Sequence, residues 1–255
     1  MKSLLIILSL LLGVETISAQ EIVMTETASI DQVFGNHIES EEPLPMNDLN
    51  VDFGYVLYQA DIKLESEDAV LEVENIRDYA VIYLGEELQG TVTDNQKKLV
   101  LQSEPGEYNL RIYVENIGRI TYGPEILDNS KGLFGDVCID GENIEGWKMT
   151  ELKIRKSKVE DLEFTPKTEV NLPEFHKANV EISEPKVMYL DVSGWGMGEV
   201  WINGQYLGSY WEEEKQQSIQ VPASALKKGK NELIVFDLKN NKQSSMKFSS
   251  GPVFK

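Results

Sequence analysis

The chain has 255 residues, of which 43 are acidic and 24 are basic, and its formal net charge is −19 at pH 7. So acidic a surface is repelled by phosphate backbones and anionic lipid headgroups, which argues against nucleic acid and membrane surfaces as partners and leaves neutral ligands open. The lone Cys138 has no partner for an intramolecular disulfide, so hydrophobic cores must stabilise the fold. At about 100–150 residues per domain, this length favours two domains.

The first nineteen residues have the pattern of a secretory signal peptide. Lys2 precedes an apolar run from Leu4 to Leu12, and the small-residue sequence Ile17-Ser18-Ala19 follows. The apolar run is shorter than the roughly 20 residues that a membrane-spanning helix needs, and no second run follows it. We therefore expect a secreted or periplasmic protein without membrane insertion. Residues 20–44 show little periodicity and are expected to form an extended lead-in.

Alternation with a period of two residues runs through the remainder of the chain. Leu110, Ile112 and Val114 alternate with polar neighbours, which is typical of strands with one buried face. Further expected strands, bounded by Gly, Pro and Asn turns, are 55–64, 71–73, 79–84, 187–192, 199–202 and 233–238. Long segments with helical periodicity are missing, although 223–228 is compatible with one short helical turn.

An internal repeat is the most informative pattern. Val81, Gly85 and Leu88 match Val200, Gly204 and Leu207 without a gap. Downstream of each copy, a glycine (Gly106 or Gly229) lies four residues before an alternating strand. The sequence therefore predicts an all-β fold of two antiparallel β-sandwich or jelly-roll domains in tandem, at residues 45–155 and 165–255, joined by a charged linker at 156–164.

Catalytic and metal-binding motifs are hard to find. The two histidines, His37 and His176, neighbour no nucleophile motif, so we interpret them as surface or packing residues and expect no catalytic residue, metal or cofactor. Calcium binding by the carboxylates of the loop 128–136 stays open. With so many acidic residues, pairs of carboxylates occur by chance, and their abundance is no evidence for glycoside hydrolysis.

Aromatic residues concentrate in the second domain. Trp195, Trp201, Tyr206, Tyr210 and Trp211 fall within 17 residues. Exposed rings stack on the apolar face of a sugar, and Asn203 or Gln216 would supply hydrogen bonds to its hydroxyls. Core packing is the competing interpretation, because Trp201 lies between Val200 and Ile202.

The stretch Ser193-Gly194-Trp195-Gly196-Met197-Gly198-Glu199-Val200-Trp201-Ile202-Asn203-Gly204 resembles the C-terminal galactose-binding-like module of family 35 β-galactosidases. Val114-Glu115-Asn116-Ile117-Gly118-Arg119-Ile120-Thr121-Tyr122-Gly123, followed by Lys131-Gly132-Leu133, is similar to the first β-domain of that family. In the family, the catalytic glutamates lie on a (β/α)8 barrel of about 250 residues that precedes these modules. The resemblance therefore implies that this chain lacks the barrel and its glutamates, and that Tyr122 faces the barrel in full-length relatives.

Three hypotheses follow for the function. The first is a secreted, non-catalytic carbohydrate-binding protein, or an accessory to a glycosidase, with a galactoside or another neutral glycan as its ligand; its candidate contacts are Trp195, Asn203, Tyr206, Tyr210, Trp211, Gln216 and Tyr122. The second is the non-catalytic part of a β-galactosidase whose barrel is a separate chain. The third is a structural remnant without a ligand.

Overall fold

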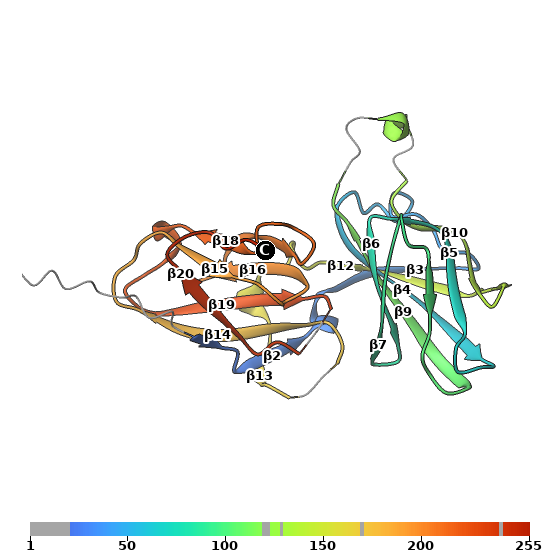
Figure 1. Ribbon diagram of the computed structural model, residues 1–255, viewed down its shortest axis with the longest axis horizontal. Helices are drawn as coiled ribbons and strands as arrows, with labels where there is room; N and C mark the ends of the chain where they lie inside the picture. The colour runs from blue at the N-terminus through green and yellow to red at the C-terminus, as the bar shows by residue number, and fades with distance from the viewer. Residues whose placement is uncertain (1–20, 119–122, 128–129, 169–170, 240–241) are drawn as a thin grey trace, which may run out of the picture.

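The computed structural model describes residues 21–118, 123–127, 130–168, 171–239 and 242–255. The expected signal peptide lies outside these residues. The described chain is all-β and holds no α-helix, as the sequence predicts, and it forms two β-sandwiches that lie side by side (Figure 1). No described helix is long and apolar enough to cross a membrane.

The first module pairs a six-stranded with a four-stranded antiparallel sheet. In spatial order, the larger sheet contains β3 (Phe34–Ser40), β12 (Trp147–Leu152), β4 (Gly54–Leu64), β9 (Gly106–Asn116), β6 (Tyr79–Leu84) and β7 (Glu87–Thr93). The smaller sheet contains β11 (Glu142–Asn143), β10 (Gly132–Ile139), β5 (Val70–Arg77) and β8 (Lys98–Val100).

The second module repeats this arrangement. Its larger sheet contains β13 (Thr165–Pro166), β2 (Glu26–Ser29), β14 (Glu174–Ile182), β19 (Gly229–Asp237), β16 (Met197–Ile202) and β17 (Gln205–Trp211). Its smaller sheet contains β1 (Glu21–Val23), β20 (Ser245–Ser249), β15 (Met188–Asp191) and β18 (Ser218–Val221). Short 3-10 turns connect the strands at η1 (Ile30–Val33), η2 (Pro124–Leu127), η3 (Val159–Asp161) and η4 (Ala223–Ala225).

The internal repeat corresponds to equivalent hairpins in the two large sheets. β6 and β7 turn at Gly85, and β16 and β17 turn at Gly204; both glycines have positive φ, at 59° and 75°. Each hairpin then lies beside a long strand that begins at Gly106 or Gly229. The two modules thus share the sheet order β4-β9-β6-β7 and β14-β19-β16-β17.

Each sandwich has its own core, and a third core joins the two modules. Alternate residues of the large sheets face inward, for example Ile112 in the first module and Val235 in the second. The residues between them face the other module, so Tyr113, Phe236 and Trp201 pack together in the third core. The central strands of each large sheet are therefore buried on both faces where the modules meet, and β6 and β16 contain buried residues only. Strands buried on both faces are continuous apolar runs rather than alternating ones.

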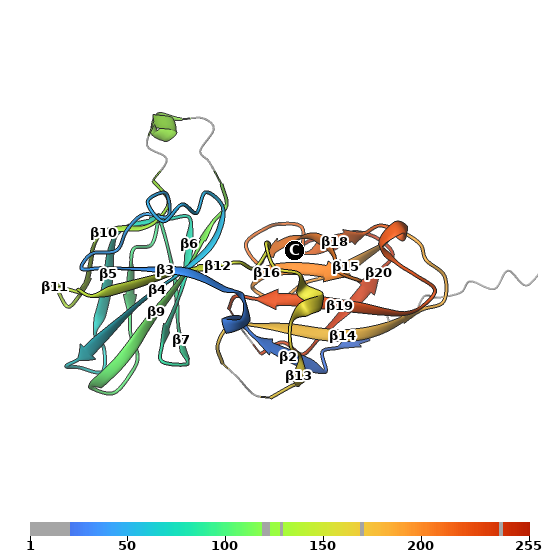
Figure 2. The ribbon, with the colours of Figure 1, turned by 180° about the vertical axis from the view of Figure 1, so that it is seen from behind.

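The segment expected as a lead-in forms strands of both modules. β1 pairs with β20 and β2 with β14 in the second module, whereas β3 pairs with β12 in the first. The chain then returns to the second module through residues 153–164. This return segment is more than a solvated linker, because Val159 is buried in the third core and Gln32 forms two hydrogen bonds with the backbone of Glu163. Figure 2 shows both crossings from behind.

Candidate functional site

A buried polar cluster joins the modules at one end of their interface. The Glu199 carboxylate, on β16, has no exposed surface. Tyr55 of β4 donates its hydroxyl to Glu199 Oε1 at 2.7 Å, and Tyr206 of β17 donates to Oε2 at the same distance. Arg155, from the return segment, places Nε 2.6 Å and Nη2 2.5 Å from Oε1. Donors from three segments of the chain therefore neutralise the buried Glu199 carboxylate and satisfy both of its oxygens.

Glu115, on β9, is a second buried carboxylate in the same cluster. Its Oε1 lies 3.5 Å from Arg155 Nη2, while its Oε2 is buried without a hydrogen-bond partner. Burial, followed by the neighbouring charge of Glu199, raises the pKa of Glu115 to about 7. Arg155 is thus the cationic partner of both the Glu115 and the Glu199 carboxylates. The pair is closed off from solvent, so it stabilises the interface rather than meeting a substrate.

A cleft opens at the other end of the interface. The register of β12, β4, β9 and β6 arranges the module-facing residues in rows. One row is Leu152, Tyr55, Glu115 and Tyr79, and the next is Thr150, Leu57, Tyr113 and Val81. Both rows are buried. The third row is polar and consists of Lys148, Gln59 and Arg111, with Tyr83 next to Arg111. Lys148, Gln59 and Arg111 line a cavity of about 770 Å³.

Hydrogen bonds fix the polar row. Gln59 Nε2 donates to Asn109 Oδ1 at 3.1 Å, and Arg111 Nε donates to the same oxygen at 3.2 Å. Asn109 Nδ2 donates in turn to Asp61 at 2.9 Å. The Lys148 ammonium forms no ion pair with any described carboxylate. Asn109 therefore holds two of the three lining side chains of this wall, Gln59 and Arg111, in place.

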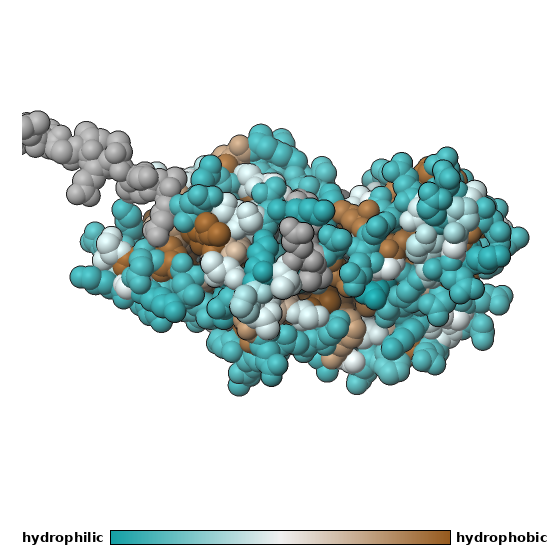
Figure 3. All heavy atoms as spheres, turned by 90° about the horizontal axis from the view of Figure 1, so that it is seen from below, coloured by the Kyte–Doolittle hydropathy of each residue, from teal (hydrophilic) through white to brown (hydrophobic). Residues whose placement is uncertain are grey.

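The opposite wall comes from the second module and η1. It includes the exposed acidic residues Asp31 and Glu163 and the buried Glu174. The cavity is also lined by Phe34, the first residue of β3 in the first module, which is 38% exposed. Burial is the main cause that raises the pKa of Glu174 to about 7. Figure 3, seen from below, shows hydrophobic residues along the seam between the modules. One aromatic face among several polar groups is the composition of a sugar-binding surface.

Two of the aromatic residues predicted to bind carbohydrate lie in the core of the second module. Trp195 is buried, donates Nε1 to Ser245 O at 3.0 Å, and packs edge-on against His176. Tyr210 is buried and donates its hydroxyl to Phe236 O at 2.9 Å. Because these rings fill the core, their faces are not available to a ligand in this conformation.

The other candidates in this module are dispersed. Asn203 has a φ of 49° at the β16–β17 turn, where its Nδ2 donates to Ala225 O and Asn231 Oδ1, each at 2.8 Å. Gln216 is exposed and donates Nε2 to Ser218 O. Trp211 packs edge-on against Tyr79 of the first module. Tyr206 is 43% exposed and belongs to the Glu199 cluster.

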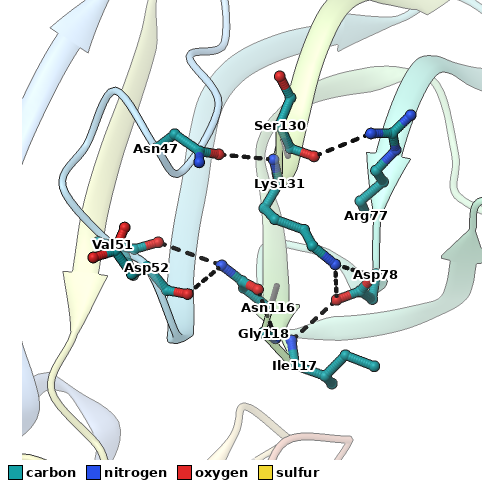
Figure 4. A network of polar contacts seen from close by, with 10 residues as sticks. All are labelled: Asn47, Val51, Asp52, Arg77, Asp78, Asn116, Ile117, Gly118, Ser130 and Lys131. Atoms are coloured by element: carbon teal, nitrogen blue, oxygen red, sulfur yellow. Dashed lines mark hydrogen bonds and ion pairs between the residues drawn. The ribbon is translucent and has the colours of Figure 1, made fainter. Parts of the chain in front are cut away.

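Tyr122 lies outside the described residues, but the base of its loop is well defined. Figure 4 shows that the buried Lys131 ammonium contacts both carboxylate oxygens of Asp78, at 2.6 and 2.8 Å, and that Asp78 Oδ2 also accepts from Ile117 N. Asn116 donates to the backbone oxygens of Val51 and Asp52. The described part of the loop beyond this base exposes Ile126 and Leu127, the latter by 96%.

Sequence reasoning missed the interface residues. Glu115 occupies an outward position in an alternating strand, which favours a solvent-exposed interpretation. The sequence does indicate a buried role for Glu199, because it is the one charged residue between Gly194 and Ile202. A carboxylate inside an apolar run requires a partner, and Arg155 is that partner here. In the described part of the chain, no three His, Cys, Asp or Glu side chains come together to hold a metal ion.

Comparisons with known proteins identify both modules. Residues 43–153 match the model of the β-galactosidase first all-beta domain, and residues 173–231 match that of the β-galactosidase galactose-binding domain. The chain carries the β-domains of the β-galactosidase family. The all-beta domain coincides with the first sandwich, and the galactose-binding domain with β14 to β19 of the second.

The relatives of these β-galactosidase domains are much longer proteins. The chain is 30% identical over 205 residues to a β-galactosidase of Xanthomonas manihotis, covering 79% of this chain and 34% of that protein. It is 32% identical over 218 residues to human β-galactosidase-1-like protein 2, covering 80% of this chain and 33% of that protein. It thus spans about a third of the length of these relatives. A Streptomyces avermitilis α-L-rhamnosidase structure aligns over 86% of this chain and 25% of that chain, with 12% identity and a TM-score of 0.27.

Proposed function

We propose that this chain is a secreted, non-catalytic carbohydrate-binding protein that holds a galactoside in the cleft between its modules. The observation that carries the proposal is the cleft itself, whose lining combines the half-exposed ring of Phe34 with the polar side chains of Gln59 and Arg111. The match to a β-galactosidase galactose-binding domain supports a galactoside as the ligand class. The sealed Glu115 and Glu199 pair supports a binding role rather than hydrolysis, because these carboxylates do not reach the cleft.

Calorimetric titration of the purified chain with methyl β-galactoside and lactose tests the binding. We expect saturable binding, which Phe34→Ala weakens roughly tenfold because the ring no longer stacks on the sugar. Phe254→Ala is the matched control, since Phe254 is an exposed phenylalanine that does not line the cleft. Binding that is absent, or equally insensitive to both substitutions, would overturn this site.

A chromogenic β-galactoside tests the non-catalytic part of the proposal. We expect no release of chromophore by the purified chain. Turnover that disappears on further purification comes from a contaminant. Turnover that co-elutes with the chain through size-exclusion chromatography contradicts a purely binding role.

A second candidate function is that of the accessory part of a β-galactosidase whose catalytic domain is a separate chain. The near-complete exposure of Leu127, on a loop whose base is fixed by Lys131 and Asp78, favours this alternative. A pull-down from the native secretome would then recover a glycoside hydrolase, and Leu127→Asp would abolish its recovery. Recovery that Leu127→Asp leaves unchanged would remove the loop from this role.

A further inference from the structure

Both basic residues that line the cleft lie on the large sheet of the first module. These are Lys148 and Arg111, whereas three of the four lining carboxylates, Asp31, Glu163 and Glu174, come from η1, the return segment and the second module, and the fourth, Glu86, lies at the β6–β7 turn. In a chain with 43 acidic and 24 basic residues, two cations in one strand row without a carboxylate partner are an unusual local arrangement. Among the described residues, neither cation forms an ion pair, and the Arg111 contact with Asn109 is to a neutral amide.

The register sets the spacing of the two cations. Lys148 and Arg111 both lie beside Gln59, on the strands that flank β4. Neighbouring strands are about 4.8 Å apart, so the two backbones are separated by roughly 10 Å. Two side chains of this length, at this separation, are able to reach one small anionic group held between them above Gln59.

We propose that the preferred ligand of the cleft is an acidic sugar, a galactoside whose C6 carries a carboxylate, and that Lys148 and Arg111 bind this carboxylate. The inference rests on the proposed carbohydrate-binding function and assigns its substrate class. The sugar hydroxyls then face the opposite wall, where carboxylate oxygens accept hydrogen bonds from them. In this arrangement, Phe34 lies beside the sugar ring rather than beside the C6 carboxylate of the ligand.

The net charge of the protein does not prevent this recognition. Repulsion from distant surface carboxylates is largely screened beyond a Debye length, which is about 8 Å at physiological ionic strength. The two cations act on the ligand at contact distance, where charge-assisted hydrogen bonds are about twice as strong as neutral ones. A sugar with one negative charge therefore meets two cations at contact distance, although four carboxylates also line the cleft.

Parallel titrations of the intact chain with methyl β-D-galacturonide and methyl β-D-galactoside test the proposal. We expect the uronide to bind about tenfold more tightly than the neutral sugar. Lys148→Gln should remove most of this preference, so that the affinity for the uronide falls close to that for the neutral galactoside. Arg111→Gln should act in the same direction. Lys98→Gln is the matched control, because Lys98 is an exposed strand lysine outside the cleft, paired with Glu72.

The outcomes distinguish the two proposals. A neutral galactoside that binds as tightly as the uronide, or a uronide preference that survives Lys148→Gln, overturns the acidic-sugar assignment and leaves the binding function standing. Failure of both sugars to bind overturns both. Circular dichroism and thermal melting of Lys148→Gln separate a binding defect from unfolding, and the exposed position of Lys148 predicts an unchanged melting temperature.

Discussion

Glu199 shows how one side chain connects distant parts of the molecule. Tyr55, Arg155 and Tyr206 all direct donors at its carboxylate, and they come from the first module, the return segment and the second module. Removing one member of a buried ion pair costs more than forming the pair gains, because the remaining charge stays desolvated. The residues of this cluster therefore couple the two modules.

We predict that Glu199→Gln lowers the free energy of unfolding by about 3 kcal/mol, because Arg155 then lacks its main counter-charge. Urea denaturation at pH 7 measures the change. Glu72→Gln is the control, since Glu72 forms an exposed pair with Lys98 and should cost less than about 1 kcal/mol. Equal losses for the two variants would show that the buried cluster contributes no more than a surface pair.

His176 makes stability depend on pH. Burial, and then the charge of Lys167, lowers its pKa to about 3, and both ring nitrogens are buried without hydrogen-bond partners. The unfolded chain, with an ordinary histidine pKa near 6.5, therefore binds the proton more readily than the folded chain between about pH 6.5 and 3. The stability contributed by the neutral imidazole is lost as pH falls through this window.

Replacing this histidine should remove that loss. For His176→Phe, we predict that stability relative to the unmodified protein rises as pH is lowered from about 6.5 towards 3, by up to about 1.4 kcal/mol per pH unit. Buried Glu115 and Glu174 contribute with the opposite sign between about pH 4.5 and 7. The contribution of Glu115 cancels in the comparison, whereas Glu174 Oε1 lies 3.8 Å from His176 Nδ1 and is coupled to the substitution, so the interval from about pH 4.5 to 3 carries the test. His37→Phe is an exposed control. A parallel pH profile for His176→Phe and the unmodified protein would contradict the assignment.

At the scale of elements, the N-terminal strands belong to structures that are completed late in the sequence. β1 forms an edge next to β20, and β2 lies between β13 and β14. Ile22 and Met24 are buried in the second core, while Ile30 and Val33 are buried in the third. A segment of fewer than fifteen residues thus supplies parts of two cores.

Deletion of residues 21–33 should therefore destabilise the second module more than the first. We expect a lower urea midpoint, and faster amide exchange in β14 and β20 than in β4 and β9, because the deleted strands leave their partners unpaired. A chain beginning at residue 21 is the control and should behave as the full chain. Uniform exchange in both modules would contradict a local role for these strands.

Much of the strand pattern could be predicted from the sequence, and the misses have physical causes. β6 was predicted at 79–84, as observed, and β4 was predicted to within one residue, because apolar runs with glycine and proline boundaries define interior strands well. β1 and β2 were missed because they are short strands of three and four residues with mixed polar residues such as Glu21 and Glu26. Pairing with strands more than 140 residues away defines them, and no local pattern encodes that pairing.

For the candidate site, sequence reasoning identified the aromatic cluster but not its surroundings. Trp195 and Tyr210 carry the same local signal as Tyr206, yet two are buried and one is half-exposed. Whether an aromatic ring faces the core or the solvent depends on the bulge between Val200 and Trp201 and on the packing of the other module. The row of Lys148, Gln59 and Arg111 depends on strand register, which sequence alone does not supply.

At the scale of the whole molecule, the third core makes the two sandwiches one thermodynamic unit. It contains Tyr55, Phe175 and Phe236, whose rings are 5.1–5.8 Å apart in edge-on and tilted contacts. Separating the modules would expose this apolar surface to water, at a cost of about 25 cal/mol for each Å². Separation of the two sandwiches is therefore unfavourable.

We predict a single calorimetric unfolding transition in which the calorimetric and van't Hoff enthalpies agree. Phe236→Ala should lower stability by about 3–5 kcal/mol and resolve two transitions, because it creates a cavity in the shared core. Phe248→Ala, in the core of the second module alone, should destabilise without dividing the transition. Two transitions in the unmodified protein would contradict the coupling.

The double crossing of the chain also governs how the protein responds to cleavage. The polypeptide passes from the second sandwich to the first at η1 and returns through residues 153–164. A protease that cuts one of these two connecting segments therefore leaves the other intact. The uncut segment and the third core therefore keep the two sandwiches of a nicked molecule together.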